Sequence, residues 1–146
     1  MRGEDQARAA GIALARLDAH FDEVLFSPKV RARQTAELAV ERWSEEQRGR
    51  LRAYPPLAGG FDAEAAHDAL AETTADARLL LVGHEPDLSR LVAGLTGGMA
   101  DLKKGGLAVV RLEGSRGELV VLIRPRELAL IADPALGAVA APADGD

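Results

Sequence analysis

The chain contains the run Leu79-Leu80-Leu81-Val82-Gly83-His84-Glu85-Pro86-Asp87-Leu88-Ser89. The apolar residues that follow Arg78 end at Gly83, which is typical of a strand buried on both faces of a parallel sheet. Pro86 suits the first position of a helix, because its missing N–H has no partner there, and apolar residues then recur at helical spacing at Leu88, Leu91, Val92 and Leu95. The run therefore predicts a strand, a turn and a helix, with His84 placed where free backbone N–H groups favour a phosphate.

A second turn of the same kind occurs earlier, where Glu23-Val24-Leu25-Phe26 leads into Ser27-Pro28-Lys29-Val30-Arg31. Ser27 can cap a helix, Pro28 can open it, and Arg31 then falls in its first turn. We expect this helix to extend from Lys29 to about Arg48. Its apolar stripe comprises Ala32, Ala36, Ala39, Val40 and Trp43.

The two turns predict a shared site. In an open α/β sheet, ligand groups gather at the carboxyl ends of the strands, so Arg31 and His84 can converge from separate turns. A guanidinium offers a rigid fork of donors to phosphate oxygens, and each charge-assisted hydrogen bond contributes about 1.5–3 kcal/mol. Arg31 and His84 are therefore the candidate phosphate-binding residues, and His84 is also the candidate catalytic residue. The alternative for Arg31 is a solvated helix arginine paired to Glu37 or to another neighbour.

The rest of the chain alternates helices and strands, as a layered α/β domain does. We expect one domain over residues 1–132 and a flexible tail over residues 133–146, which are rich in Ala, Pro, Gly and Asp. The first helix is expected at Glu4–Ala19 and should bury Ala10, Ala13, Leu14 and Leu17. The further expected elements are a short strand at Leu51–Tyr54, a helix at Asp62–Glu72, and a hairpin of strands Leu107–Leu112 and Glu118–Ile123.

Composition is consistent with one sizeable core, since 47% of the 146 residues are hydrophobic. The net charge of -5 gives no support to nucleic-acid binding. Disulfides and thiol catalysis are excluded because the chain has no cysteine. No apolar stretch approaches the roughly 20 residues needed to cross a membrane, and the first residues lack a signal peptide's apolar region, so we expect a cytoplasmic protein.

At both turns the chain resembles the histidine phosphatase superfamily, and in particular its SixA-type phosphohistidine phosphatases. The resemblance is carried by residues 27–36, Ser-Pro-Lys-Val-Arg-Ala-Arg-Gln-Thr-Ala, and by residues 82–89, Val-Gly-His-Glu-Pro-Asp-Leu-Ser. Weaker likenesses at residues 6–11, 103–108 and 123–125 extend it to about Leu128. It implies a three-layer αβα sandwich of the phosphoglycerate-mutase-like type with a mostly parallel sheet. It also implies a signalling phosphatase that acts on phosphohistidine or a small phosphate ester without a cofactor.

One family motif is absent from these 146 residues. Members of this family begin with a strand that ends in Arg-His-Gly, whose histidine attacks phosphorus while the adjacent arginine grips the phosphate. The three histidines here are His20, His67 and His84, and none stands between Arg and Gly. We expect the strand and its nucleophile to lie upstream of Met1. Loss of a nucleophile from a cooperating catalytic set can cost on the order of a millionfold in turnover.

Without that strand, its neighbours in the sheet would expose unpaired N–H and C=O groups. Two segments are candidates to fill the gap. One is the apolar run Leu128-Ala129-Leu130-Ile131-Ala132, and the other is a strand from a second copy of the chain, which would make a homo-oligomer through an open sheet edge.

Other polar residues have ordinary interpretations. Arg33 lies about 200° around an ideal helix from Arg31 and should face solvent. His20 and His67 have no motif around them and fit surface or helix-end positions. The candidate carboxylates for protonating a leaving group are Asp62, Glu64 and Glu85, and the alternatives for Glu85 are to point to solvent or to cap the helix. No spacing resembles a metal-ligand set, so no metal is expected.

Two hypotheses from different classes follow, together with a plainer one. The chain is most of a SixA-like phosphatase whose nucleophile lies outside it, or it is an inactive module that binds phosphate or a phosphorylated protein through Arg31 and His84. The plainer alternative is a scaffold that associates through its open sheet.

Overall fold

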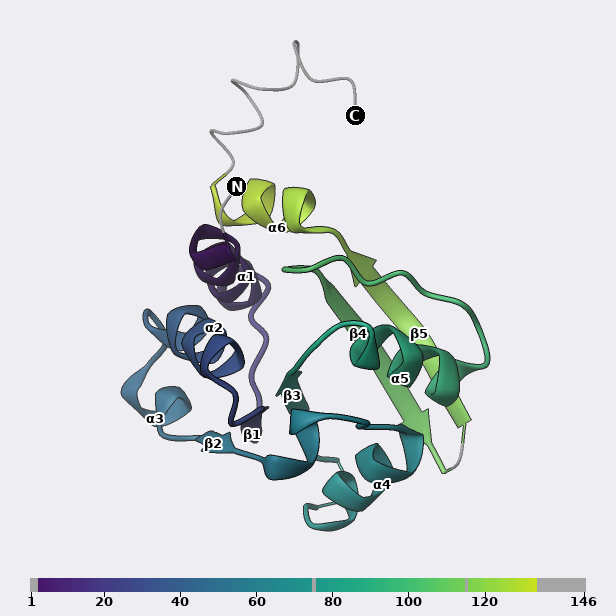
Figure 1. Ribbon diagram of the computed structural model, residues 1–146. Helices are drawn as coiled ribbons and strands as arrows, with labels where there is room; N and C mark the ends of the chain where they lie inside the picture. Colours follow the sequence, from purple (N-terminus) through teal and green to yellow (C-terminus); the bar gives the residue numbers. More distant parts are fainter. Residues whose placement is uncertain (1–2, 75, 115, 134–146) are drawn as a thin grey trace, which may run out of the picture.

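The fold is built around a central strand, β1 (Glu23–Phe26) (Figure 1). The structure, a computed structural model, describes residues 3–74, 76–114 and 116–133. β1 is the middle strand of a three-stranded parallel sheet, between β2 (Leu51–Ala53) and β3 (Leu79–Val82). Phe26 stands opposite Ala53 on one side and Val82 on the other. The three strands predicted from the sequence are confirmed. Of the expected tail, residues 134–146 lie outside the described residues.

The faces of this sheet are covered by different helices. On one face, Val24 packs in a cluster with Leu14 of α1 (Gly3–Arg16) and Val40 of α2 (Val30–Val40). On the other face, Leu25 packs with Ala66 and Ala69 of α4 (Ala63–Ala71) and with Leu91 of α5 (Asp87–Thr96). The alternation of Val24 and Leu25 follows from the two-residue period of a strand. The result is the expected three-layer αβα sandwich.

The last two strands form a separate sheet. β4 (Leu107–Glu113) and β5 (Arg116–Ile123) pair antiparallel, with a register shift between Val109 and Val110. Leu107 packs in the same apolar cluster as Leu80 and Val82 of β3. The hairpin lies against α5 (Figure 1). Among the described residues, β3 pairs only with β1 and β4 only with β5. One edge of each strand is therefore without a backbone partner in this part of the chain.

Two expectations about this region are wrong. All four residues of β3 are half-buried rather than buried, because β3 is an edge strand of its sheet. The run from Leu128 to Ala132 is not an inserted strand. It belongs to helix α6 (Pro125–Ala132), which packs against α1 and buries Leu128 completely.

The long helix expected after β1 is interrupted. α2 ends at Val40, and a short α3 (Glu45–Arg48) begins after Ser44, whose side chain accepts a hydrogen bond from the Gln47 N–H. A capping serine starts a new helix because it satisfies a free N–H of the first turn. The predicted stripe of Ala32, Ala36, Ala39 and Val40 is buried. Trp43 is also buried, but in the connection between the two helices.

The other helices match their sequence patterns closely. Asp62 caps α4 through the Ala65 N–H, and Gly97 ends α5 with a φ of 79°. α5 begins at Asp87, so Pro86 is its N-cap residue and not, as expected, its first residue. A 3-10 turn, η1 (Pro55–Ala58), connects β2 to the loop before α4. In α1, Ala13 and Leu14 are buried as expected and Ala10 is half-buried, but Leu17 is 53% exposed because the helix stops at Arg16. None of the described helices has both the length and the apolar character to span a bilayer.

The helices α1 and α2 cross in close contact at Gly11. A Cβ atom built on Gly11 would lie 1.7 Å from the backbone oxygen of Ala39. The Gly11 carbonyl also accepts a hydrogen bond of 2.9 Å from the indole Nε1 of Trp43, whose ring stacks on Phe21. Gly11 is therefore required for this approach of two backbones.

We expect Gly11→Ala to lower the free energy of unfolding by about 1–3 kcal/mol, because neither backbone can yield without disturbing the layer above the sheet. Chemical denaturation followed by Trp43 fluorescence measures this loss. Gly3→Ala is the matched control, since a Cβ atom on Gly3 meets nothing within 4 Å. Equal stability of the two variants would contradict the close crossing.

Tyr54 is the only tyrosine of the chain, and it is buried directly after β2. Burial, and secondarily the Glu72 carboxylate, raise the pKa of its hydroxyl above the ordinary value of 10.0. A raised pKa in the folded state adds stability that is complete below the unfolded pKa and is lost as pH rises through the folded pKa.

Alkaline titration of the native protein, followed by phenolate absorbance, should therefore give a midpoint above that of the unfolded chain in urea. Glu72→Gln should lower the midpoint partway, because burial remains while the carboxylate charge is gone. Coincident midpoints for native and unfolded protein would contradict the burial of this hydroxyl.

Candidate functional site

The two predicted turns lie side by side at the carboxyl edge of the parallel sheet. β1 and β3 are neighbours in register, and the pairing continues one residue further, because the Ser27 N–H donates to the Val82 carbonyl at 2.9 Å. The chain then leaves β1 toward α2 and leaves β3 toward α5. The topology therefore brings Ser27 and His84 to one place, although 57 positions separate them in the sequence.

A direct contact joins these turns. Nε2 of His84 lies 2.7 Å from Oγ of Ser27. The Ser27 side chain is completely buried, and His84 is half-buried. A serine and a histidine at this distance can form a nucleophile and base pair, but a hydroxyl with no exposed surface is not accessible to a substrate. Ser27 thus contacts His84 and has no surface open to a ligand.

Ser27 does not cap α2 in the expected way. The N-cap residue is Lys29, which makes no side-chain capping bond, and α2 begins at Val30. The Ser27 Oγ instead accepts the Lys29 N–H at 3.3 Å. Because the Ser27 N–H continues the pairing of β1 with β3, its backbone position is set by the sheet. Its hydroxyl contacts both the Lys29 N–H in the turn and Nε2 of His84.

Arg31 lies in the first turn of α2, just after the carboxyl end of β1, and its side chain is exposed. Among the described residues it has no ion pair, so the pairing with Glu37 or a neighbour that the alternative interpretation included is not formed, although the side chain is solvated. Arg33 is exposed as well, but its guanidinium lies 5.5 Å from the centroid of the Phe26 ring. Arg33 therefore contacts the last residue of β1, which its helical angle alone did not indicate.

Two of the three candidate acids have structural partners. The Glu85 carboxylate accepts hydrogen bonds from the N–H and the hydroxyl of Ser89, and the Ser89 hydroxyl accepts one from the Leu102 N–H. This contact supports the capping interpretation of Glu85. Asp62 caps α4, and Glu64 is exposed in the first turn of that helix.

Of the other histidines, His20 is exposed and lies 3.1 Å from an Asp18 carboxylate oxygen, while His67 is half-buried on α4. Neither follows the carboxyl end of a strand. Within residues 3–74, 76–114 and 116–133, no three His, Cys, Asp or Glu side chains lie close enough together to hold a metal ion.

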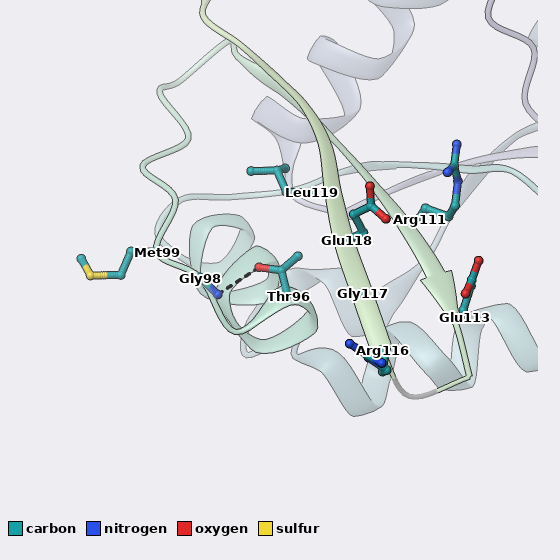
Figure 2. Close-up of a pocket in the computed structure, with 9 residues that line it drawn as sticks. All are labelled: Thr96, Gly98, Met99, Arg111, Glu113, Arg116, Gly117, Glu118 and Leu119. Atoms are coloured by element: carbon teal, nitrogen blue, oxygen red, sulfur yellow. Dashed lines mark hydrogen bonds between the residues drawn. The ribbon is translucent and has the colours of Figure 1, made fainter.

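A surface pocket of about 630 Å³ lies away from these turns, between the end of α5 and the hairpin (Figure 2). Its lining includes neither Ser27, Arg31 nor His84. Two arginines and two glutamates line it, in the cross-strand pairs Arg111 with Glu118 and Glu113 with Arg116, and it is open to solvent. Balanced charge gives it no preference for an anion, so the turns at the sheet edge remain the candidate site.

The chain is similar to known proteins in sequence and in fold. A sequence model of the histidine phosphatase superfamily (branch 1) matches residues 1–52. An uncharacterized protein of Picosynechococcus sp. is 34% identical over 139 residues, which cover 87% of this chain and 82% of that protein.

Solved structures share the fold at lower sequence identity. The protein histidine phosphatase SixA complexed with tungstate has a TM-score of 0.73 at 24% identity, over 86% of this chain and 82% of that one. A candidate phosphohistidine phosphatase SixA from Agrobacterium tumefaciens has a TM-score of 0.69 at 19% identity, over 84% and 80%. A candidate alpha-ribazole-5'-phosphate phosphatase from Escherichia coli has a TM-score of 0.68 at 20% identity, over 86% and 83%.

The fold of the solved phosphatases, the paired turns at residues 27–36 and 82–89 and the sequence relationship therefore agree: the chain belongs to the histidine phosphatase superfamily and has the fold of its SixA-type members.

Proposed function

We propose that the chain binds the phosphoryl group of a phosphohistidine protein or of a small phosphate ester at the carboxyl edge of β1 and β3. The observation that carries this proposal is the contact between Ser27 and His84, which fixes the histidine beside the turn that leads to Arg31. A related fold is known in complex with tungstate, an oxyanion of similar shape to phosphate.

The two candidate residues have different roles in this proposal. Arg31 is exposed, and its planar guanidinium can donate two parallel hydrogen bonds to phosphate oxygens. His84 is half-buried, and it donates from a fixed position to charge that develops in the transition state. The positive field comes from these side chains and from backbone N–H groups, without a metal or cofactor.

Hydrolysis requires a nucleophile, which we propose is supplied by an Arg-His-Gly strand outside these 146 residues. His84 is held by Ser27, His20 lies beside Asp18, and His67 is on α4, so none of the three is presented as a nucleophile next to Arg31. In the complete reaction, the histidine of that strand attacks phosphorus in line and the leaving group departs. Water then hydrolyses the phosphoenzyme. The alternative is a binding module that holds the phosphorylated partner without chemistry.

The unpaired edges of β3 and β4 support a second proposal about partners. Free N–H and C=O groups on a strand edge are a template for another strand. We propose that the 146-residue chain associates with a second copy through these edges when no other strand occupies them.

Arg31→Ala should weaken the binding of inorganic phosphate by about 10- to 100-fold, which corresponds to one charge-assisted interaction. His84→Ala should weaken it less. Isothermal titration calorimetry at constant ionic strength measures both. Arg42→Ala is the matched control, because it removes the same charge from an exposed residue after the end of α2. Equal affinity in the wild type and both site variants would remove these turns from the proposed function.

Turnover of a phosphohistidine peptide should be detectable only when the chain is preceded by a strand ending in Arg-His-Gly. The comparison uses three proteins: the 146-residue chain, the extended chain, and the extended chain with the added histidine replaced by Ala. Only the second should hydrolyse the peptide, because the other two lack the nucleophile.

Sedimentation of the same proteins tests the edge proposal. We expect the short chain to associate and both extended chains to be monomeric. Activity of the short chain equal to that of the extended one would contradict the role of the added histidine. If none of the three proteins hydrolyses the peptide but phosphate binding is retained, the binding module is favoured. A monomeric short chain would contradict association through the sheet edge.

A further inference from the structure

Ser27 is a buried polar side chain in a region that otherwise packs apolar groups. Its relative exposure is 0%, and it directly follows Phe26, which is also buried. Its backbone is fixed by the hydrogen bond from its N–H to the Val82 carbonyl. The position of the hydroxyl is therefore set by the sheet and does not depend on a mobile loop.

The hydrogen bonds of this hydroxyl determine where its proton lies. A serine Oγ can donate one hydrogen bond and accept others. Its contact with the Lys29 N–H at 3.3 Å is one in which Oγ can only accept. Its other contact is Nε2 of His84 at 2.7 Å. A buried donor without an acceptor is unfavourable, and among the described residues Nε2 is the acceptor available to this hydroxyl.

We propose that Ser27 is a positioning residue that donates its hydroxyl proton to Nε2 and so holds neutral His84 in the Nδ1–H tautomer. Free neutral imidazole favours the opposite tautomer, with the proton on Nε2, so the buried serine reverses the intrinsic preference. The same bond fixes the orientation of the ring. Because Nε2 is occupied by the serine hydroxyl, Nδ1 is the ring nitrogen that is left to contact a ligand.

This arrangement leaves Nδ1–H as the ring donor for a ligand. Within the described part of the chain, Nδ1 makes no hydrogen bond, and His84 as a residue is half-buried rather than buried. The tautomer assignment stands on the Ser27 contacts alone, whereas the use of Nδ1–H toward a phosphate oxygen rests on the proposed function. Ser27 is therefore an indirect contributor: it selects the atom that His84 presents.

Long-range 1H–15N correlation spectra of the 15N-histidine-labelled protein test the assignment, at a pH where the imidazoles are neutral. With only three histidines in the chain, His20 and His67 serve as internal references for correct folding. We expect His84 to show the Nδ1–H pattern in the wild type, and a shift toward Nε2–H in Ser27→Ala. Ser27→Thr keeps a hydroxyl at the same place and should retain the Nδ1–H pattern.

Ser89→Ala is the matched control. It removes another serine hydroxyl from the same region, one that contacts Glu85 and Leu102 but not His84, so it should leave the His84 tautomer unchanged. Inorganic phosphate should bind about fivefold more weakly to Ser27→Ala, the loss expected for one misdirected neutral donor.

An Nε2–H pattern for His84 in the wild type, or an Nδ1–H pattern that persists in Ser27→Ala with His20 and His67 unchanged, would overturn the inference. An Nδ1–H pattern in a wild-type protein that binds no phosphate would instead contradict the proposed function and leave the tautomer assignment intact. The two failures are thus distinguishable.

Discussion

The parallel pairing of β1 with β3 is the contact on which both the layers and the candidate site depend. β1 is the buried centre of the sheet, and its alternating side chains separate the two apolar clusters, one under α1 and α2 and the other under α4 and α5. The same pairing sets Phe26 opposite Val82. One further backbone hydrogen bond, from the Ser27 N–H to the Val82 carbonyl, brings Ser27 to the start of the turn that contains His84. A shift of one residue would reverse every side chain of β3 and separate the two turns. Fold and site are therefore consequences of one register.

The division of the strands into two sheets explains where apolar surface remains exposed. The four residues of β3 are apolar but only half-buried, and Leu119, Val120, Val121 and Leu122 of β5 are each at least 36% exposed. In a continuous sheet such residues would be covered by neighbouring strands and helices. On β3 and β5 this exposure accompanies strand edges that have no backbone partner among the described residues, where a further strand would satisfy the hydrogen-bonding groups. Leu17, Val30 and Met99 are exposed elsewhere in the fold. The segment Leu128–Ala132 does not supply that strand, because Pro125 starts a helix there and Leu128 is buried in the contact with α1.

The sequence predicted most elements because their signals are local. Apolar runs marked the strands, and Asp62 marked the start of α4. The interruption after Val40 was missed, because the capping role of Ser44 competes with an apolar stripe that continues to Trp43. The site was predicted only in part. His84 and Arg31 follow strand ends and could be named from the sequence. The Ser27 contact with His84 and the Arg33 contact with Phe26 depend on how neighbouring elements pack, which spacing along one helix or strand does not reveal.

The proposed function separates binding from turnover physically. Oxyanion binding needs hydrogen-bond donors, and in the proposal these are His84, which contacts Ser27, and Arg31 in the first turn of α2. The carboxylates Glu85 and Asp62 accept hydrogen bonds from N–H groups at helix N-termini, which compensate part of their negative charge. Turnover needs in addition a nucleophile in line with the leaving group, and under the proposed function that group comes from an added strand. In the proposal, this strand pairs with an edge of β3 or β4 that has no backbone partner among the described residues, so one strand supplies both the sheet pairing and the nucleophile.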